Sequence, residues 1–328
     1  MKKSIIVLVA LCFATMFAVP AHSQIKKLAQ TGLQFLKVDV SARAAAMGGA
    51  FTMPGNDASA MFYNPAGMAN LGHKVDVFTS RTEWIADISY NAAGVAFDLG
   101  NWGTVGASFL FSDYGDEIVG TQVGGAAGYT ITGPLDVGAY AIGLSYARAL
   151  TDKFSIGGQV KYARQHLGES VLTAGEPAVE NKVSGLAFDF GTIFYPGFQS
   201  LRIGMSVNNF SGQFKYADEP FQLPLTFKIG VAMDVLDFFG EHGNPLLIAV
   251  DAIHPRDYTE RIQMGGEYWY NDLIALRAGY KFNYDEESYS LGAGLKHTVA
   301  GTTFKLDYSY SDFGRFDAVS RFSLGFAF

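Results

Sequence analysis

The residue types that most often carry catalysis or bind metals are present in this sequence, but they are widely spaced. No histidine has a second histidine or a cysteine at the spacing of zinc sites, and no Gly-x-Ser-x-Gly segment could hold a serine nucleophile. The run Tyr284 to Ser288 gathers three acids, but such runs are typical of a solvated turn. We therefore predict no catalytic residue, no metal site, no cofactor and no enzyme activity. The histidines beyond residue 23 are His73, His166, His242, His254 and His297.

Charge and cysteine content exclude two further classes of protein. The formal net charge is −7, and it becomes −9 once Lys2 and Lys3 are removed with the first 23 residues, which hold no acid. An acidic chain is a poor partner for nucleic acid. Cys12 is the only cysteine, so a chain without those residues has no disulfide framework.

The first 23 residues are predicted to be a signal peptide. Two lysines precede the apolar run Ile5 to Val19, and small residues in Ala21 to Ser23 suit a cleavage site. A membrane anchor is the alternative, but the run is short for a spanning helix. We expect the mature protein to begin near Gln24.

Period-two alternation dominates the remainder of the chain. In the segment 224–236, Phe227, Ile229 and Val231 share one face, while Lys228 and Gly230 share the other. The alternating segments run about 10 to 13 residues, the length of a tilted strand that crosses a bilayer. A soluble β-sandwich also alternates, but its strands average about five or six residues. The predicted fold is all-β: a transmembrane outer-membrane β-barrel.

About fourteen antiparallel strands are expected over residues 73–328. The connections after even-numbered strands are mostly short, and the long ones, 115–137, 166–182 and 211–223, follow odd-numbered strands. Outer-membrane barrels have short periplasmic turns and longer extracellular loops, so both chain ends are predicted to be periplasmic. The expected strands are 74–81, 88–98, 103–114, 138–150, 153–165, 183–195, 200–210, 224–236, 245–254, 260–270, 273–283, 288–298, 302–312 and 318–328.

The same alternation sorts side chains between the lumen and the lipid. Charged residues that alternate with apolar ones are predicted to face the lumen. These are Lys228, Asp234, Arg261, Glu267, Lys305 and Asp307. The last strand ends on an outward apolar series that is similar to the signal read by the barrel-assembly machinery. Its members are Phe322, Leu324, Phe326 and Phe328.

Residues 24–72 lack strand alternation and are predicted to form a small helical unit. Ser41 and Asp57 are suitable N-caps, and Pro65 forces Asn64 out of the helical region. Gly67 is expected to permit a sharp turn toward the first strand. Because a fourteen-strand barrel is wider than its own side chains fill, this unit is predicted to plug the lumen as a hatch. The alternative is that it braces the periplasmic rim.

Two motifs within this unit carry a resemblance to known families. "DASAMFYNPAGMAN", Asp57 to Asn70, is similar to the hatch segment of the FadL family of hydrophobic-compound transporters. "TGLQFLKVDVSARAAAMGGAFT", Thr31 to Thr52, more closely resembles the PorV/PorQ branch of that superfamily. Met53 to Asn56 depart from the pattern. The hatch motif assigned on this basis comprises Arg43, Gly48, Gly49, Asp57, Asn64, Pro65, Ala66 and Gly67.

The resemblance implies a function that composition does not. A PorV-type barrel implies a component or cargo carrier of type IX secretion, with secreted C-terminal domains and other secretion subunits as partners. A FadL-type barrel implies passive transport of fatty acids or aromatic compounds, with a hydrophobic ligand. Both imply contact with outer-membrane lipid. The lumen-facing set is polar, which favours the secretion role over the transport role.

Overall fold

The segments with alternating apolar and polar residues form the strands of the barrel wall. One face of each strand is turned to lipid, and the other packs against the interior. In β12 (Thr226–Asp234), Ile229 and Val231 are exposed on the outside, whereas a Cβ at Gly230 would meet Thr52 inside. The structure is a computed structural model that describes residues 30–115, 118–123, 127–171, 177–216, 219–240 and 243–328. The predicted signal peptide, 1–23, lies outside the described residues.

The fourteen wall strands close into one antiparallel barrel in which β1 pairs with β18. Chain neighbours pair throughout, except that β3 pairs with β6 and β9 with β12 because two hairpins lie outside the wall. The wall strands are β1 Val75–Glu83, β2 Ser89–Asp98, β3 Thr104–Asp113, β6 Val137–Thr151, β7 Phe154–Ser170, β8 Val179–Phe194, β9 Arg202–Phe210, β12, β13 Leu246–Pro255, β14 Arg261–Tyr270, β15 Ile274–Phe282, β16 Tyr289–Val299, β17 Thr302–Ser311 and β18 Val319–Ala327.

The predicted strand count is confirmed, and most boundaries fall within a few residues of the prediction. The segments 115–137 and 211–223, expected as loops, instead contain small hairpins. These are β4 Val119–Val123 with β5 Tyr129–Pro134, and β10 Gln213–Lys215 with β11 Pro220–Gln222.

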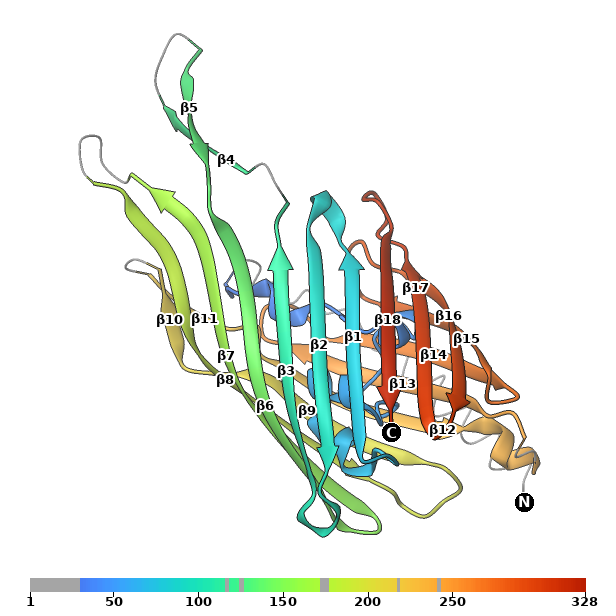
Figure 1. Cartoon of the computed structure of the whole chain (residues 1–328). Coiled ribbons are helices and arrows are strands. Elements are labelled where there is room, and N and C mark those ends of the chain that lie inside the picture. The colour runs from blue at the N-terminus through green and yellow to red at the C-terminus, as the bar shows by residue number, and fades with distance from the viewer. Residues whose placement is uncertain (1–29, 116–117, 124–126, 172–176, 217–218, 241–242) are drawn as a thin grey trace.

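Three strands are two to four residues longer than predicted and project beyond the rest of the barrel. β6, β7 and β8 have 15, 17 and 16 residues, whereas their neighbours β3 and β9 have 10 and 9. Figure 1 shows these three strands rising past the barrel rim with the β4–β5 hairpin at their tip. We call this region the flap: β4 to β5 and the ends of β6, β7 and β8 beside it.

The two ends of the barrel differ in their connections. The short-turn end has, among others, the β6–β7 turn at 152–153 and the β16–β17 turn at 300–301; β1 begins and β18 finishes there. The long-loop end has the flap and the β10–β11 hairpin. Three short helical segments lie in connections: Ile85–Asp87 (η4), Gly100–Trp102 (η5) and Val235–Phe239 (η6). In the described part of the chain, no helix is both long and apolar enough to cross a membrane.

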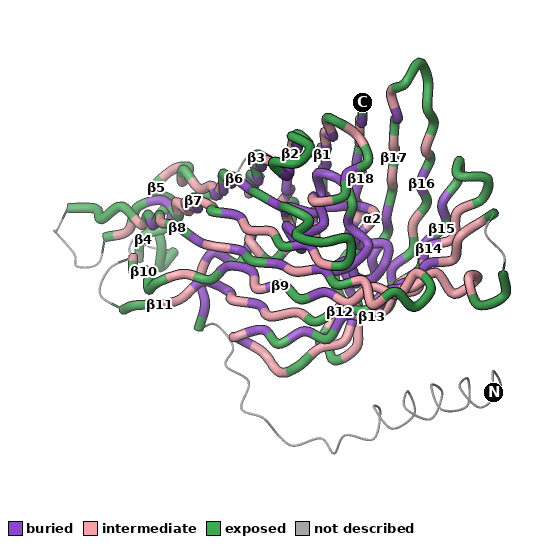
Figure 2. Tube along the Cα trace, turned by 90° about the horizontal axis from the view of Figure 1, so that it is seen from below, coloured by how far each residue is buried: buried purple, intermediate pink, exposed green. Residues whose placement is uncertain are grey.

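Residues 31–71, which precede β1, lie inside the barrel, as the buried stretches around α2 in Figure 2 indicate. They contain one α-helix, α2 (Ala42–Ala46), and three 3-10 helices, η1 (Gln34–Lys37), η2 (Ala58–Phe62) and η3 (Pro65–Asn70). Different pieces contact different parts of the wall: α2 packs on β15 to β18, η2 on β1 to β3, and η3 on β6 to β8. We call residues 31–71 the hatch.

Candidate functional site: the hatch and the vestibules on either side

The α2 helix is seated by caps and by close backbone contact. Ser41 Oγ accepts a hydrogen bond from Ala44 N–H at 3.4 Å, so Ser41 is the predicted N-cap. Gly48 and Gly49 then end the helix with φ of 65° and 80°, a region that favours glycine. On the wall, a Cβ at Gly265 or Gly279 would overlap the Met47–Gly48 backbone, so glycine there lets the helix lie directly on the strands.

Arg43 joins α2 to a buried quartet of charges. Its guanidinium donates to both carboxylate oxygens of Glu267, at 2.7 and 2.6 Å. Arg277 donates to Glu267 at 2.6 Å and to Asp307 at 2.7 Å. Two arginines and two acids make the group electrically neutral, and the fork geometry of arginine suits this bidentate contact. Burial by itself would lower the pKa of Arg43, but Glu267 holds it above its usual value.

Asp57 links η2 to the same side of the lumen. Its carboxylate caps η2 by accepting from Ser59 N–H at 3.0 Å, as predicted. It also lies 3.6 Å from Lys305 Nζ and 3.9 Å from Arg43. Burial by itself would raise the pKa of Asp57, but Lys305 and Arg43 hold it below its usual range. The hatch is therefore attached here by charge.

Asn64 and Pro65 fix the position of η3 against the wall. Asn64 is extended (φ −140°), and its side-chain oxygen accepts from Ala66 N–H at 3.1 Å. Its amide nitrogen donates to Thr52 O and to Thr192 O of β8, at 2.9 and 3.2 Å. Pro65 ends the helical region before it, as predicted, and is also the first residue of η3, where its missing N–H costs nothing.

The predicted role of Gly67 is wrong. Gly67 lies within η3 and is absent from the residues with positive φ, so it makes no sharp turn. Its value is its size, because a Cβ there would overlap the carbonyl oxygen of Gly55. The turn before β1 is made at Gly72, with φ 75°.

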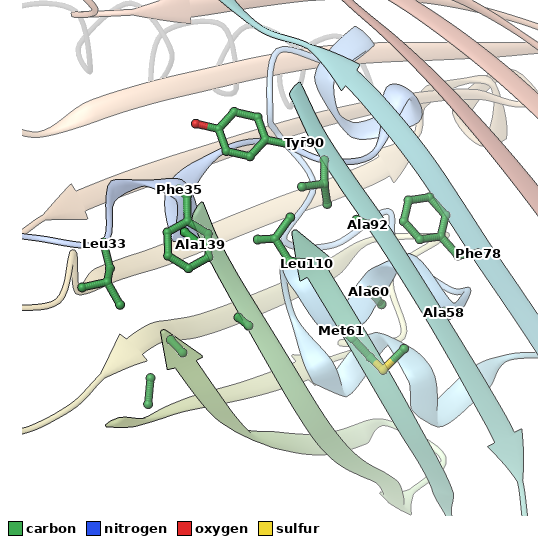
Figure 3. Close-up of a cluster of buried hydrophobic side chains, with 14 of the residues drawn as sticks. Leu33, Phe35, Ala58, Ala60, Met61, Phe78, Tyr90, Ala92, Leu110 and Ala139 are labelled. Carbon is green, nitrogen blue, oxygen red and sulfur yellow. The ribbon is translucent and has the colours of Figure 1, made fainter. Parts of the chain in front are cut away.

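The rest of the hatch packs through apolar side chains. Figure 3 shows Phe35 of the hatch beside Ala139 of β6. Leu33 and Met61 of the hatch belong to the same apolar cluster, with Leu110 of β3 and Phe78 of β1. Most of the wall residues in this cluster are alanines, which leave room for the side chains of the hatch. This side of the hatch is held by close packing of apolar side chains.

The hatch separates two vestibules. A cavity of about 340 Å³ at the short-turn end is lined by the quartet and by Asp57, Asp234 and Lys305. A second cavity of about 300 Å³ at the long-loop end is lined by Lys228, Arg261 and residues of the N-terminal part of the hatch. All six predicted lumen-facing residues line one or the other: Lys228, Asp234, Arg261, Glu267, Lys305 and Asp307.

Several charged residues that face the interior were missing from the predicted set. Lys281 lies 2.9 Å from Asp39 and also pairs with Glu287, while Arg321 donates to the Asp39 carbonyl at 2.7 Å. Asp251 accepts from the N–H and the hydroxyl of Thr52, at 2.9 and 2.6 Å. Arg277 and Lys281 alternate with Leu276 and Tyr280, so the same period-two signal could have identified them.

The predicted assembly signal faces outward on β18. Phe322, Leu324 and Phe328 are exposed, and Phe326 packs against Phe304 of β17 with 5.6 Å between ring centroids. The backbone of Phe328 exchanges two hydrogen bonds with Val75, each 2.9 Å. The last residue of the chain therefore takes part in closing the barrel.

Among the described residues, no group of three or more His, Cys, Asp or Glu could hold a metal ion.

Comparison with known families gives the context for this architecture. The family model described as "Type IX secretion system protein PorV" matches residues 21–251, more than half of the chain. The chain belongs to the PorV family. It is an outer-membrane β-barrel with the FadL-like fold. No curated protein matches it in sequence.

Solved structures with the same fold as this PorV-family chain include hydrocarbon channels. A Pseudomonas aeruginosa FadL homologue has a TM-score of 0.56 at 14% identity and covers 89% of this chain and 98% of its own. The CymD monoaromatic hydrocarbon channel has a TM-score of 0.54 at 13% identity, covering 91% and 99%. The Pseudomonas putida toluene transporter TodX has a TM-score of 0.52 at 14% identity, covering 87% and 96%. At these identities the similarity establishes the fold alone.

Proposed function

We propose that this protein is a component of type IX secretion that holds secreted cargo at its long-loop end. The observation that carries the proposal is a polar lumen that the hatch divides into two vestibules. The hatch crosses the barrel between two vestibules, and charged side chains from opposite ends of the chain attach it to the wall. A barrel divided in this way is better suited to presenting surfaces to a partner than to conducting a solute.

The flap supplies a surface suited to a protein partner. Its apolar side chains are exposed, including Val119, Tyr129 and Ile131 of the hairpin and Leu167 of β7. Ile131 has an exposed fraction of 60%. Contiguous exposed apolar side chains outside the lipid region favour protein association. We infer that cargo C-terminal domains, or other secretion subunits, dock here.

Transport of hydrophobic small molecules is the second candidate. It rests on the fold shared with the hydrocarbon channels, and it would require a continuous apolar route past the hatch. Charged residues line both vestibules: Lys228 and Arg261 on one side of the hatch, Arg43 and Lys305 on the other. An apolar solute would desolvate these groups without replacing their partners. The lumen therefore favours the secretion role.

The orientation in the membrane is part of the proposal. Short turns on the periplasmic side would put the start of β1 and the end of β18 in the periplasm and the flap outside the cell. The outward apolar series ending at Phe328 would then be the segment that the barrel-assembly machinery reads. No catalytic activity, cofactor or nucleic-acid partner is assigned to the barrel.

Affinity capture from the native membrane tests this proposal. Tagged barrel should retain secreted proteins that share one C-terminal domain, identified by mass spectrometry. Ile131→Asp should reduce their recovery severalfold, because it adds a charge to the flap's apolar surface. Thr130→Asp, which adds the same charge to the same hairpin strand, is the matched control. Recovery of no such protein, with tight binding of aromatic hydrocarbons instead, would favour the transport role.

A further inference from the structure

The vestibule at the long-loop end carries more positive than negative charge. Its lining includes five cationic side chains but two acidic ones, in a volume of about 300 Å³. The cations come from the hatch and from four separate strands. They are Lys37, Lys228, Arg261, Lys281 and Arg321, and the acids are Asp39 and Glu287.

The acids are already engaged. Lys281 pairs with both Asp39 and Glu287. Lys37 pairs at 2.7 Å with Asp257, which lies outside the lining. Among the described residues, the other three cations have no acidic side chain within ion-pair distance: Lys228, Arg261 and Arg321. Even with Asp257 counted, the vestibule keeps a surplus of positive charge.

Arg261 is the most constrained of these three cations. Its guanidinium lies between the rings of Tyr258 and Tyr284, with its central carbon 3.8 and 4.1 Å from their centroids. Its Nε is buried and has no hydrogen-bond acceptor. An unpaired buried donor is costly, and most such donors in proteins have a partner. The two rings hold the guanidinium in place, so little further ordering would be needed to bind an acceptor.

Neighbouring groups point to the same kind of ligand. The hydroxyl of Tyr284 accepts a hydrogen bond from Gln263 at 2.8 Å, which leaves its own hydrogen to be donated. Lys228 lies over the ring of Tyr63, with Nζ 5.8 Å from the centroid. Asp251, on the strand next to Lys228, is held by Thr52 of the hatch. The unpaired donors and the surplus positive charge therefore favour a ligand whose hydrogen-bond acceptors carry negative charge.

We propose that this vestibule is an anion-binding site that takes a carboxylate or phosphate group arriving from the long-loop end. Arg261 and the Tyr284 hydroxyl would donate hydrogen bonds to the oxygens, and Lys228 and Arg321 would supply the balancing charge. A cation would be repelled by the surplus charge, and an apolar ligand would leave Arg261 unpaired. The inference rests on the cavity alone and is independent of the secretion proposal.

Titration calorimetry on the folded, detergent-solubilised barrel tests the site. The probes are an acetylated tetra-alanine peptide with a free carboxylate, the same peptide as its amide, and inorganic phosphate. The amide should bind at least about tenfold more weakly than the acid, because it loses the charge-assisted hydrogen bonds. Displacement of the peptide by phosphate would mean that the site accepts either group. Binding of one probe alone would identify whether carboxylate or phosphate is the source of the ligand.

Variants assign the binding to this vestibule. Arg261→Gln should weaken anion binding about tenfold or more, and Arg261→Lys should have an intermediate effect because it keeps the charge but loses the fork. Lys182→Gln removes one charge from an exposed position on β8 and should leave binding unchanged. Heat-dependent migration on gels checks that each variant is folded. The proposal is overturned if acid and amide both bind with equal affinity, if neither the acid nor phosphate binds, or if Arg261→Gln behaves like Lys182→Gln.

Discussion

Two sides of the barrel interior hold the same hatch by different means. We call β2, β3, β6 and β7 the neutral wall, because the side chains they turn inward are mostly small and uncharged. We call β14, β15, β17 and β18 the charged wall. Examples from the neutral wall are Ala92, Ser108, Ala141 and Gly157; examples from the charged wall are Glu267, Arg277, Lys305 and Arg321. Lys161 of β7 is an exception, paired with Asp189 of β8 at 2.8 Å.

The difference shows that burial alone does not determine how a contact responds to change. Close contact between small side chains depends on volume, and ionic strength affects it little. Buried ion pairs depend on both partners being present and charged. The neutral wall should therefore be intolerant of added volume, and the charged wall intolerant of a lost charge.

Removing the hatch should give the largest effect, because both walls then face water. Deletion of residues 24–70 should leave a folded barrel whose lumen conducts ions, since a barrel of this width is not filled by its own side chains. Planar-bilayer recordings should show little conductance from the intact protein and a clear rise on deletion. Unchanged conductance in a folded deletion variant would mean that this segment does not seal the lumen.

Breaking the charge quartet should be the most costly point change. Glu267→Gln leaves Arg43 and Arg277 buried with Asp307 as the remaining acid of the group, and should cost about 3–5 kcal/mol. Urea titration in lipid vesicles measures the loss. Glu83→Gln breaks an exposed ion pair with Arg81 and should cost at most about 1 kcal/mol. Equal losses would show that burial does not distinguish the two pairs.

Added volume should harm the neutral wall. A Cβ at Gly157 would overlap the backbone of Pro65 and Ala66, so Gly157→Val should cost about 1–3 kcal/mol and displace η3. The adjacent Gly158 has only ordinary contact distances around its added Cβ, so Gly158→Val is the matched control. Urea titration and protease cleavage of the hatch report the two effects. Similar behaviour of the two variants would contradict the close seating of η3.

Low pH should weaken the contact of the hatch with the charged wall and leave its contact with the neutral wall unchanged. Lys305 and Arg43 depress the pKa of Asp57, and Lys281 and Lys228 that of Asp39, in each case against the effect of burial. A carboxyl group whose pKa is depressed in the folded protein stabilises the packed hatch at pH values above its usual pKa of about 3.9. This contribution is lost as the pH falls through the lower pKa of the folded state. Protease access to the hatch should rise below about pH 4 and stay constant between pH 5 and 8. Asp57→Asn should reduce the acid response.

The smallest effect is expected at the rim. Lys37 and Asp257 also link the hatch to the barrel, at 2.7 Å, but the lysine side chain is partly exposed. Lys37→Gln should cost about 1 kcal/mol or less, because water and salt screen such pairs. The cost should fall further in 1 M salt, whereas that of Glu267→Gln should not. A large, salt-independent loss would place this pair with the buried quartet.

Local signals in the sequence were sufficient for much of this architecture. Alternation located all fourteen wall strands, and Ser41 and Asp57 marked two helix starts because N-capping depends on adjacent residues. The pairing of Arg43 with Glu267 was beyond reach, since only the closed barrel brings residues this far apart in sequence together. Gly67 was misjudged for a related reason. Its neighbour Gly55 lies on a separate segment of the hatch, and a glycine needed for close approach looks like a glycine needed for a turn.

The seam between β1 and β18 constrains the order in which this barrel assembles. Phe328 pairs with Val75, so the sheet becomes a cylinder only when the end of β18 meets the start of β1. This contact joins the first and last strands of the wall. Contacts between residues so far apart in sequence form slowly, because closing the loop between them costs conformational entropy. The hatch precedes β1 in the sequence and packs inside the closed barrel, so we expect it to be in place before β1 and β18 pair. The wall would then close around the hatch, and the hatch would not have to enter a finished barrel.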